Sequence, residues 1–202
     1  MKKYRFTDET KSCNGVILHR IIALIDIPFH HVKAGDLGGF IQSENNLSQD
    51  GSAWVSGQAL VFNDARVYED AVARSKATIC GNAKVHGQAK VRENAMISEN
   101  AEIYDESVIY NKAHVYGDAR VHGKSLISGD AKVYGNAEVE DSVVKANAQV
   151  FEHARVINSR ISDSGVVFND AQVLSGTVSE NAQVYGSATV SGGTISGVTK
   201  VC

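Results

Sequence analysis

The sequence contains little proline, cysteine or aromatic side chain, and it has no long apolar run. Among 202 residues there is one proline, and the three cysteines (Cys13, Cys80 and Cys202) lie far apart without CxxC spacing. Three such cysteines cannot all pair, and the first residues turn polar at once instead of forming a secretory leader, so we expect a reducing, cytoplasmic setting. The longest apolar run, residues 21–25, is too short to cross a bilayer. We therefore expect a soluble protein with no membrane partner.

An excess of one charge sign is also lacking. The chain has 20 Lys and Arg against 23 Asp and Glu, for a formal net charge of −3, which gives no reason to expect nucleic acid as a partner. The adjacent His30 and His31 lack further ligands at the spacing of a metal site, so we expect no metal. Gly35, Gly38 and Gly39 are not followed by the Lys-Ser/Thr of a phosphate-binding loop. The sequence thus predicts neither a nucleic-acid-binding protein nor a metalloenzyme.

What the sequence does have is a six-residue repeat. From Val55 onward every sixth residue is aliphatic, and two residues before each lies a small one, usually Ala, with Ser107 and Ser125 as exceptions. Side chains two apart on a strand point the same way, so both would face inward. Gly, Asn and Asp crowd the turn positions because they tolerate left-handed backbone angles. A period of six fits no amphipathic helix, so the repeat predicts short strands joined by tight turns.

After Val139 the repeat shortens in a regular way. The spacing of the aliphatic residues changes from six, six, six to five, six, six, so one corner in every three loses a residue. A deletion that recurs at every third corner indicates that three strands make one coil. The sequence therefore predicts an all-β fold, a single-stranded parallel β-helix of about nine three-sided coils, 18 and then 17 residues long.

Residues 1–50 do not follow the repeat. Asn14-Gly15 is a tight-turn pair in front of the β-prone segment 16–27, which predicts a small antiparallel unit. A glycine-rich loop at residues 34–39 would lead from this unit into the first coil. Such a unit would cap the unpaired end of the solenoid. We therefore predict two parts, an N-terminal β cap with its connecting loop (1–50) and a hexapeptide-repeat β-helix (51–202).

The N-terminal segment also carries a family resemblance. Tyr4-Arg5, the run Val32-Lys33-Ala34-Gly35-Asp36-Leu37-Gly38-Gly39-Phe40 and Trp54-Val55 resemble the opening of the YdcK-type hexapeptide-repeat proteins of enterobacteria and phages. The resemblance implies left-handed coiling and a relation by fold to trimeric hexapeptide acyltransferases. It also suggests that the chain is encoded by a phage or prophage.

The coil geometry places one outward residue per coil in each column of the surface. The column that starts after Val61 contains five consecutive aromatic residues, which we expect to form a ladder. The rings would either stiffen the solenoid by stacking on one another or form an interface for a second chain or a ligand. The five residues are Tyr116, Tyr134, Phe151, Phe168 and Tyr185.

The two other faces offer weaker candidates. The face centred on Val55 exposes Val108, Leu126 and Val143, and we expect the cap or another subunit to cover part of it. The third face carries charges of mixed sign beside alternating Tyr and His residues. It is interpreted either as a solvated face with cross-coil ion pairs or as a ligand-binding strip.

An enzyme of the hexapeptide acyltransferase class would need a histidine base beside a pocket. The candidates are His86, His114 and His122, with His153 as a fourth. No coil after residue 50 contains an insertion that could fold over an acyl donor, so we expect no such pocket. The sequence therefore predicts a non-enzymatic rigid rod that acts through its outer faces.

Such a rod would be a binding or scaffold protein that associates with itself or with a protein partner and needs no cofactor. As a phage protein it would block a host factor or capture a ligand. The alternative that stays open is an acetyl-CoA-dependent hexapeptide-repeat acyltransferase.

Overall fold

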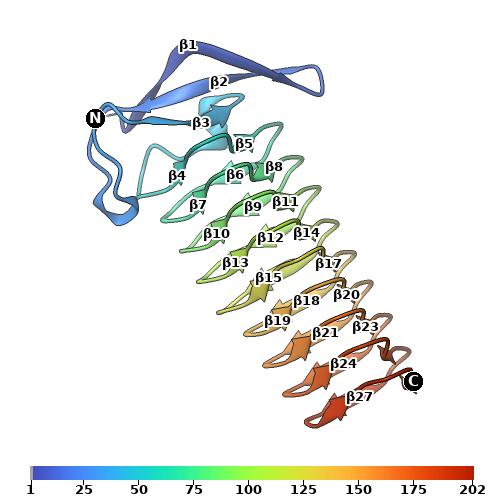
Figure 1. The fold of residues 1–202 in the computed structure, drawn as a ribbon. Helices are drawn as coiled ribbons and strands as arrows, with labels where there is room; N and C mark the ends of the chain where they lie inside the picture. Colours follow the sequence, from blue (N-terminus) through green and yellow to red (C-terminus); the bar gives the residue numbers. More distant parts are fainter. Residues whose placement is uncertain (1) are drawn as a thin grey trace.

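The protein is a rod of stacked coils with a small antiparallel sheet at one end (Figure 1). The structure, a computed structural model, describes residues 2–202. Within this range the helical segments are two short 3-10 turns, η1 (Pro28–His30) and η2 (Glu44–Asn46). The predicted all-β parallel solenoid with an N-terminal β cap is confirmed. The left-handed coiling implied by the family resemblance stays a prediction.

The rod has three faces, and each face is a parallel sheet of strands two or three residues long. Face 1 has nine strands, each paired in parallel with the strand of the next coil. They are β4 (Trp54–Val55), β7 (Val72–Ala73), β10 (Lys90–Val91), β13 (Val108–Ile109), β16 (Leu126–Ile127), β19 (Val143–Val144), β22 (Arg160–Ile161), β25 (Thr177–Val178) and β28 (Thr194–Ile195).

Face 2 belongs to the twelve-stranded sheet that runs on into the cap. Its strands in the coils are β5 (Leu60–Val61), β8 (Thr78–Ile79), β11 (Met96–Ile97), β14 (His114–Val115), β17 (Lys132–Val133), β20 (Gln149–Val150), β23 (Val166–Val167), β26 (Gln183–Val184) and β29 (Lys200–Val201).

Face 3 has eight strands, and those after the first three coils are three residues long. They are β6 (Arg66–Val67), β9 (Lys84–Val85), β12 (Glu102–Ile103), β15 (Arg120–His122), β18 (Glu138–Glu140), β21 (Arg155–Ile157), β24 (Gln172–Leu174) and β27 (Thr189–Ser191).

The pairing register confirms the change in coil length. His114 lies opposite Lys132, whereas Lys132 lies opposite Gln149, so the step from one coil to the next becomes one residue shorter. The inward residues are also those predicted. Ala119 and Val121 have no exposed surface, whereas Arg120 between them is exposed. Alternation on a strand thus directs the small and aliphatic residues into one continuous core along the rod.

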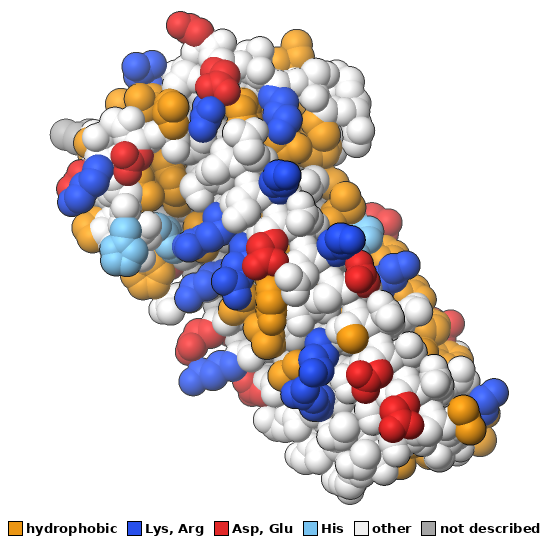
Figure 2. All heavy atoms as spheres, in the orientation of Figure 1, with side chains coloured by type: hydrophobic (Ala, Val, Ile, Leu, Met, Phe, Trp, Pro, Cys, Tyr) orange, Lys and Arg blue, Asp and Glu red, His pale blue; other side chains and the backbone are white. Residues whose placement is uncertain are grey.

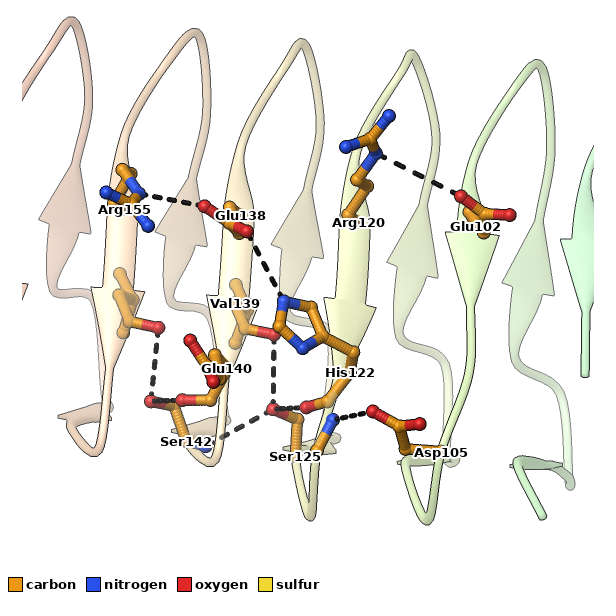
Figure 3. Close-up of polar contacts among 12 residues, drawn as sticks. Glu102, Asp105, Arg120, His122, Ser125, Glu138, Val139, Glu140, Ser142 and Arg155 are labelled. Atoms are coloured by element: carbon orange, nitrogen blue, oxygen red, sulfur yellow. Dashed lines mark hydrogen bonds and ion pairs between the residues drawn. The ribbon is translucent and has the colours of Figure 1, made fainter. Parts of the chain in front are cut away.

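The shortened corners are held by buried serines (Figure 3). In a full-length corner the small residue donates its N–H within the turn, as Ala101 does to the Ser98 carbonyl at 3.3 Å. The shorter turn has no such acceptor. Instead the Ser142 N–H donates to Ser125 Oγ (3.2 Å), and the Ser159 N–H donates to Ser142 Oγ (2.9 Å). Each hydroxyl therefore satisfies a backbone donor of the next coil that would otherwise be buried and unpaired.

The cap forms as the turn chemistry predicts. Strands β1 (Tyr4–Cys13) and β2 (Val16–Ala23) are antiparallel and are joined at Asn14 and Gly15, which have φ of 49° and 80°. Strand β3 (Leu37–Ile41) is antiparallel to β2 and parallel to β5, so it joins the cap to the first coil. The parallel stacking reaches upstream of residue 51, since Leu47 also bridges to Val67 in parallel.

The glycine pair in the connecting loop has a packing reason. A Cβ on Gly38 would lie 2.7 Å from the Val55 carbonyl oxygen, and one on Gly39 would lie 2.7 Å from the Ala59 carbonyl oxygen. Both distances are too short for any side chain, so only glycine lets β3 cross the first coil this closely. This part of the family-like segment is therefore required by the fold.

Candidate functional site

The five predicted aromatic residues form one continuous stack along the outside of face 2. From Tyr116 through Tyr134, Phe151 and Phe168 to Tyr185, successive ring centroids are 4.8, 4.8, 5.1 and 5.2 Å apart. Their planes deviate from parallel by 1° to 14°. We call these five residues the aromatic ladder. The prediction that the rings stack on one another is confirmed, whereas their use as an interface stays a prediction.

The stacking decides which part of each ring meets solvent. Every inner ring has its two faces covered by its neighbours, so all five side chains are half-buried and their edges point outward. A nucleobase or another planar ring needs about 3.5 Å on each side to stack, and a spacing near 5 Å leaves no such gap. The ladder therefore offers a ridge of ring edges and not a set of stacking surfaces.

The first members of the same column are already covered by protein. Phe62 is 4% exposed and packs with Leu18, Phe40 and Leu60 under the β1–β2 hairpin, and the half-buried Cys80 touches this group. Burial raises the pKa of the Cys80 thiol, with a smaller effect from Cys13. The cap thus covers the first members of this column with side chains from strands that continue the sheet of face 2.

The strands of face 2 beside the ladder carry few charges, although the turns that follow its rings contain the exposed Asp118, Glu152 and Asp170. The second outward column of this face has one basic residue in its middle coils and is otherwise apolar, amide or imidazole: Met96, His114, Lys132, Gln149, Val166 and Gln183. In Figure 2 hydrophobic side chains follow the right-hand edge of the rod, where β14, β17 and β20 lie in Figure 1. Few charges beside an apolar ridge are typical of the core of a protein interface.

Face 3 differs, because it carries ion pairs across coils (Figure 3). The Arg155 Nε lies 2.8 Å from a Glu138 carboxylate oxygen, and the His122 Nε2 lies 3.4 Å from the other oxygen. Burial acts to raise the pKa of Glu138, but the hydrogen bond and charge of Arg155, with those of His122, outweigh it and hold this pKa below its usual value. The ion pairs support the interpretation of face 3 as a solvated surface with cross-coil ion pairs.

A second, shorter stack lies beside these charges. Tyr68, His86, Tyr104 and His122 follow one another with centroid distances of 4.7, 5.2 and 4.8 Å. Tyr104 separates the two imidazoles, as the sequence predicts. The side chain of His122 is 13% exposed and that of His86 is 20% exposed, so both rings are mainly enclosed by their neighbours.

His114 lies on face 2 next to the start of the ladder. Its Nε2 is 2.9 Å from the Ser98 hydroxyl, and its ring centroid is 4.3 Å from that of Tyr116. Burial lowers the pKa of His114, which favours the neutral imidazole, although the charge of Glu99 acts in the opposite direction. A neutral imidazole beside a hydroxyl is the pairing of a base with a weak nucleophile. Among residues 2–202 no carboxylate forms an ion pair with His114 to orient it.

The remaining predicted interface residues lie on face 1. Val108, Leu126 and Val143 occupy neighbouring strands in register and are half-buried. Further toward the cap, Trp54 and Val72 are each 1% exposed. The loop before β3 covers these two residues, which agrees with the expectation that the cap covers part of this face.

Comparisons with known proteins bear on the family. Residues 182–197 match the family model described as the YdcK beta solenoid repeat. The chain is also 36% identical over 66 residues to the "Uncharacterized acetyltransferase YdcK" of Escherichia coli (strain K12). The match confirms the resemblance to YdcK. It covers 29% of this chain and 20% of that relative.

The turns that join the strands of the coils are short. From Trp54 to Val201 successive strands are joined by turns of four residues or fewer, so within these residues no loop extends from a coil. His86 and His122 lie at one corner of the rod and His114 lies on another face. The described residues contain no group of three or more His, Cys, Asp or Glu placed to hold a metal ion. In the same range no helix is long and apolar enough to span a membrane.

Proposed function

We propose that this chain is a non-catalytic binding rod, and that the aromatic ladder on face 2 is its docking surface for a protein partner. The observation that carries the proposal is the continuous ridge of five ring edges on a face with few charges. Under this proposal the protein needs no cofactor and engages neither nucleic acid nor a membrane. Blocking a host factor, as a phage protein would, is one use of such a rod.

A second copy of the chain is the partner that fits the ladder best. The rungs are evenly spaced, so two ladders that meet about a two-fold axis would stay in register over their whole length. Phe151 is the middle ring and would lie on that axis, with Tyr134 of one copy against Phe168 of the other. Such a contact is isologous and closes as a dimer, the commonest assembly of soluble proteins.

The size of the ladder sets how much more of face 2 must take part. The stack is roughly 20 Å long, which corresponds to a few hundred Å² of apolar surface. A specific interface buries about 800 Å² on each partner. The neighbouring column, which contains Gln149 and Val166, therefore has to be part of the contact, with the rings as its central anchors.

The proposal is tested by placing two negative charges on the ladder. Phe151→Glu combined with Phe168→Glu should abolish association, because two carboxylates in a desolvated contact are unpaired. A matched control is Thr177→Glu combined with Thr194→Glu, which adds the same charge one coil apart on face 1 and should leave the association intact. The molar mass from light scattering and the circular dichroism spectrum are measured for both variants.

The two hypotheses for the ladder, a docking surface or a stack that only stiffens the solenoid, predict different results in this experiment. If the rings serve only to stiffen the solenoid, the Phe151 and Phe168 double variant will melt at a lower temperature and its molar mass will equal that of the wild type. That result would rule out the docking role. Loss of association with an unchanged spectrum would support it.

The alternative function is acyl transfer, which is favoured by the name of the E. coli relative, an uncharacterized acetyltransferase. It would use acetyl-CoA as donor and His114 or His122 as base. We expect no binding of acetyl-CoA in calorimetry, since the turns of the coils form no cover for a donor. Saturable binding that disappears on His114→Ala or His122→Ala would establish the alternative instead.

A further inference from the structure

A cavity of about 270 Å³ lies between the cap and face 1, away from the ladder. One wall is the loop before β3 with the first residue of that strand, and it contributes His30, Asp36 and Leu37. The opposite wall is the first two coils, which contribute Trp54, Val72 and Arg74. The cavity exists because this loop passes over face 1 without filling the space above the first strands.

The floor of the cavity is apolar. The Trp54 and Val72 side chains are outward on their strands, yet each is only 1% exposed because the loop covers them. Leu37 and Val32 complete the apolar lining from the loop side. A small ligand would therefore touch apolar side chains on one side only, because the cavity is open to solvent and His30, Asp36, Ser56 and Arg74 form the rest of its lining.

One polar group in the cavity wall lacks a partner. The Arg74 Nε is buried and has no hydrogen-bond acceptor among residues 2–202. Arg92, which occupies the equivalent position one coil further along, instead lies 4.7 Å above the Tyr110 ring. A buried guanidinium N–H without an acceptor is costly. It would be satisfied by an oxyanion in the cavity, to which a guanidinium can donate two parallel hydrogen bonds.

The surroundings of Arg74 contain charges of both signs. The His30 Nε2 lies 3.0 Å from the Asp70 carbonyl oxygen, which fixes the ring against the second coil. Burial lowers the pKa of His30, and the charges of Arg74 and Lys90 add to this, whereas the hydrogen bond and charge of Asp70 act in the opposite direction. Figure 2 shows histidine side chains next to a group of Lys and Arg side chains below the cap. The Asp36 carboxylate also lines the cavity, so it disfavours a polyanion.

We propose that this cavity binds a small molecule that carries one oxyanion group, a carboxylate or a phosphate, on an apolar body. Arg74 holds the oxyanion, the Ser56 hydroxyl and the His30 ring line the same space, and Trp54 and Val72 contact the apolar part. The proposal does not depend on the ladder, which lies on another face.

The single tryptophan of the chain makes the cavity directly observable. Because Trp54 is the only Trp and lines the cavity, its fluorescence reports on occupancy. The probes are benzoate and phenyl phosphate, with phenol as the control that has the ring but no oxyanion. We expect a saturable change of emission with at least one oxyanion probe and none with phenol at the same concentration. The probe that binds more tightly identifies the oxyanion as carboxylate or phosphate.

Two variants assign the effect to the guanidinium. Arg74→Met should weaken the binding at least tenfold, whereas Arg92→Met, its match one coil away, should leave it unchanged. Circular dichroism checks that both variants fold. If Arg74→Met does not fold, Arg74→Lys is used in its place, because lysine keeps the positive charge but lacks the paired donors of the guanidinium. The proposal is overturned if neither oxyanion probe changes the emission up to about 10 mM, or if loss of the guanidinium leaves the affinity unchanged.

Discussion

Lys3 carries its ammonium group into the junction between the cap and the first coil. The side chain is 1% exposed, and its Nζ donates to the carbonyl oxygens of Asp50 at 3.3 Å and Gly51 at 3.2 Å. Burial lowers the pKa of Lys3 to about 8, although the charges of Asp50 and Asp70 act in the opposite direction. The attachment of the cap therefore rests on a charge held by carbonyl groups in a dry environment.

This burial makes the stability depend on pH in a defined direction. Between pH 8 and pH 10 the unfolded chain keeps a proton on Lys3 that the folded chain loses, so the free energy of unfolding should rise with pH. The rise should be on the order of 2 kcal/mol and should be absent in Lys3→Met. Urea unfolding at pH 7.5, 8.5 and 9.5 measures it, with Lys76→Met as the exposed control. If the free energy of unfolding depends on pH equally in the wild type and in Lys3→Met, this interpretation of the junction is wrong.

At the scale of the strand and corner, the repeat explains most of the fold. The inward pair Ala119 and Val121 could be assigned from the period alone, because a strand alternates and every coil repeats the same choice. The role of the corner serines could not be assigned from the period. Ser142 is a small residue at a position where Ala is usual, and only the backbone geometry shows that its hydroxyl accepts from the Ser159 N–H at 2.9 Å.

Removing one of these hydroxyls should therefore cost more than its size suggests. In Ser142→Ala the Ser159 N–H loses its acceptor, and the Glu140 carbonyl loses a donor at 2.6 Å. The free energy of unfolding should fall by about 1–3 kcal/mol. Ser164→Ala, at an exposed position, should change it by less than about 0.5 kcal/mol. Chemical unfolding of both variants provides the comparison, and equal small losses would mean that water replaces the serine at the corner.

At the scale of the whole molecule, the cap and the coils together determine which surfaces remain open. The hairpin covers Phe62, and the loop before β3 covers Trp54, so the first coils are enclosed on two faces. The ladder begins beyond this cover. Its column could be predicted from the coil length, but the orientation of its rings could not, because residue spacing does not fix side-chain torsions. The cavity was also outside the reach of the repeat, since it depends on the path of a non-repeating loop.

Photo-crosslinking tests most directly whether two ladders associate. Phe168 is replaced by the photoreactive benzoylphenylalanine, and the same replacement of Thr177 on face 1 serves as the control. Upon irradiation the Phe168 variant should form a covalent dimer whose crosslink maps to the strand that contains Lys132 and Val133, next to Tyr134, as the two-fold arrangement requires. The Thr177 variant should remain a single chain. Equal crosslinking at both positions, or no dimer at position 168, would contradict the account.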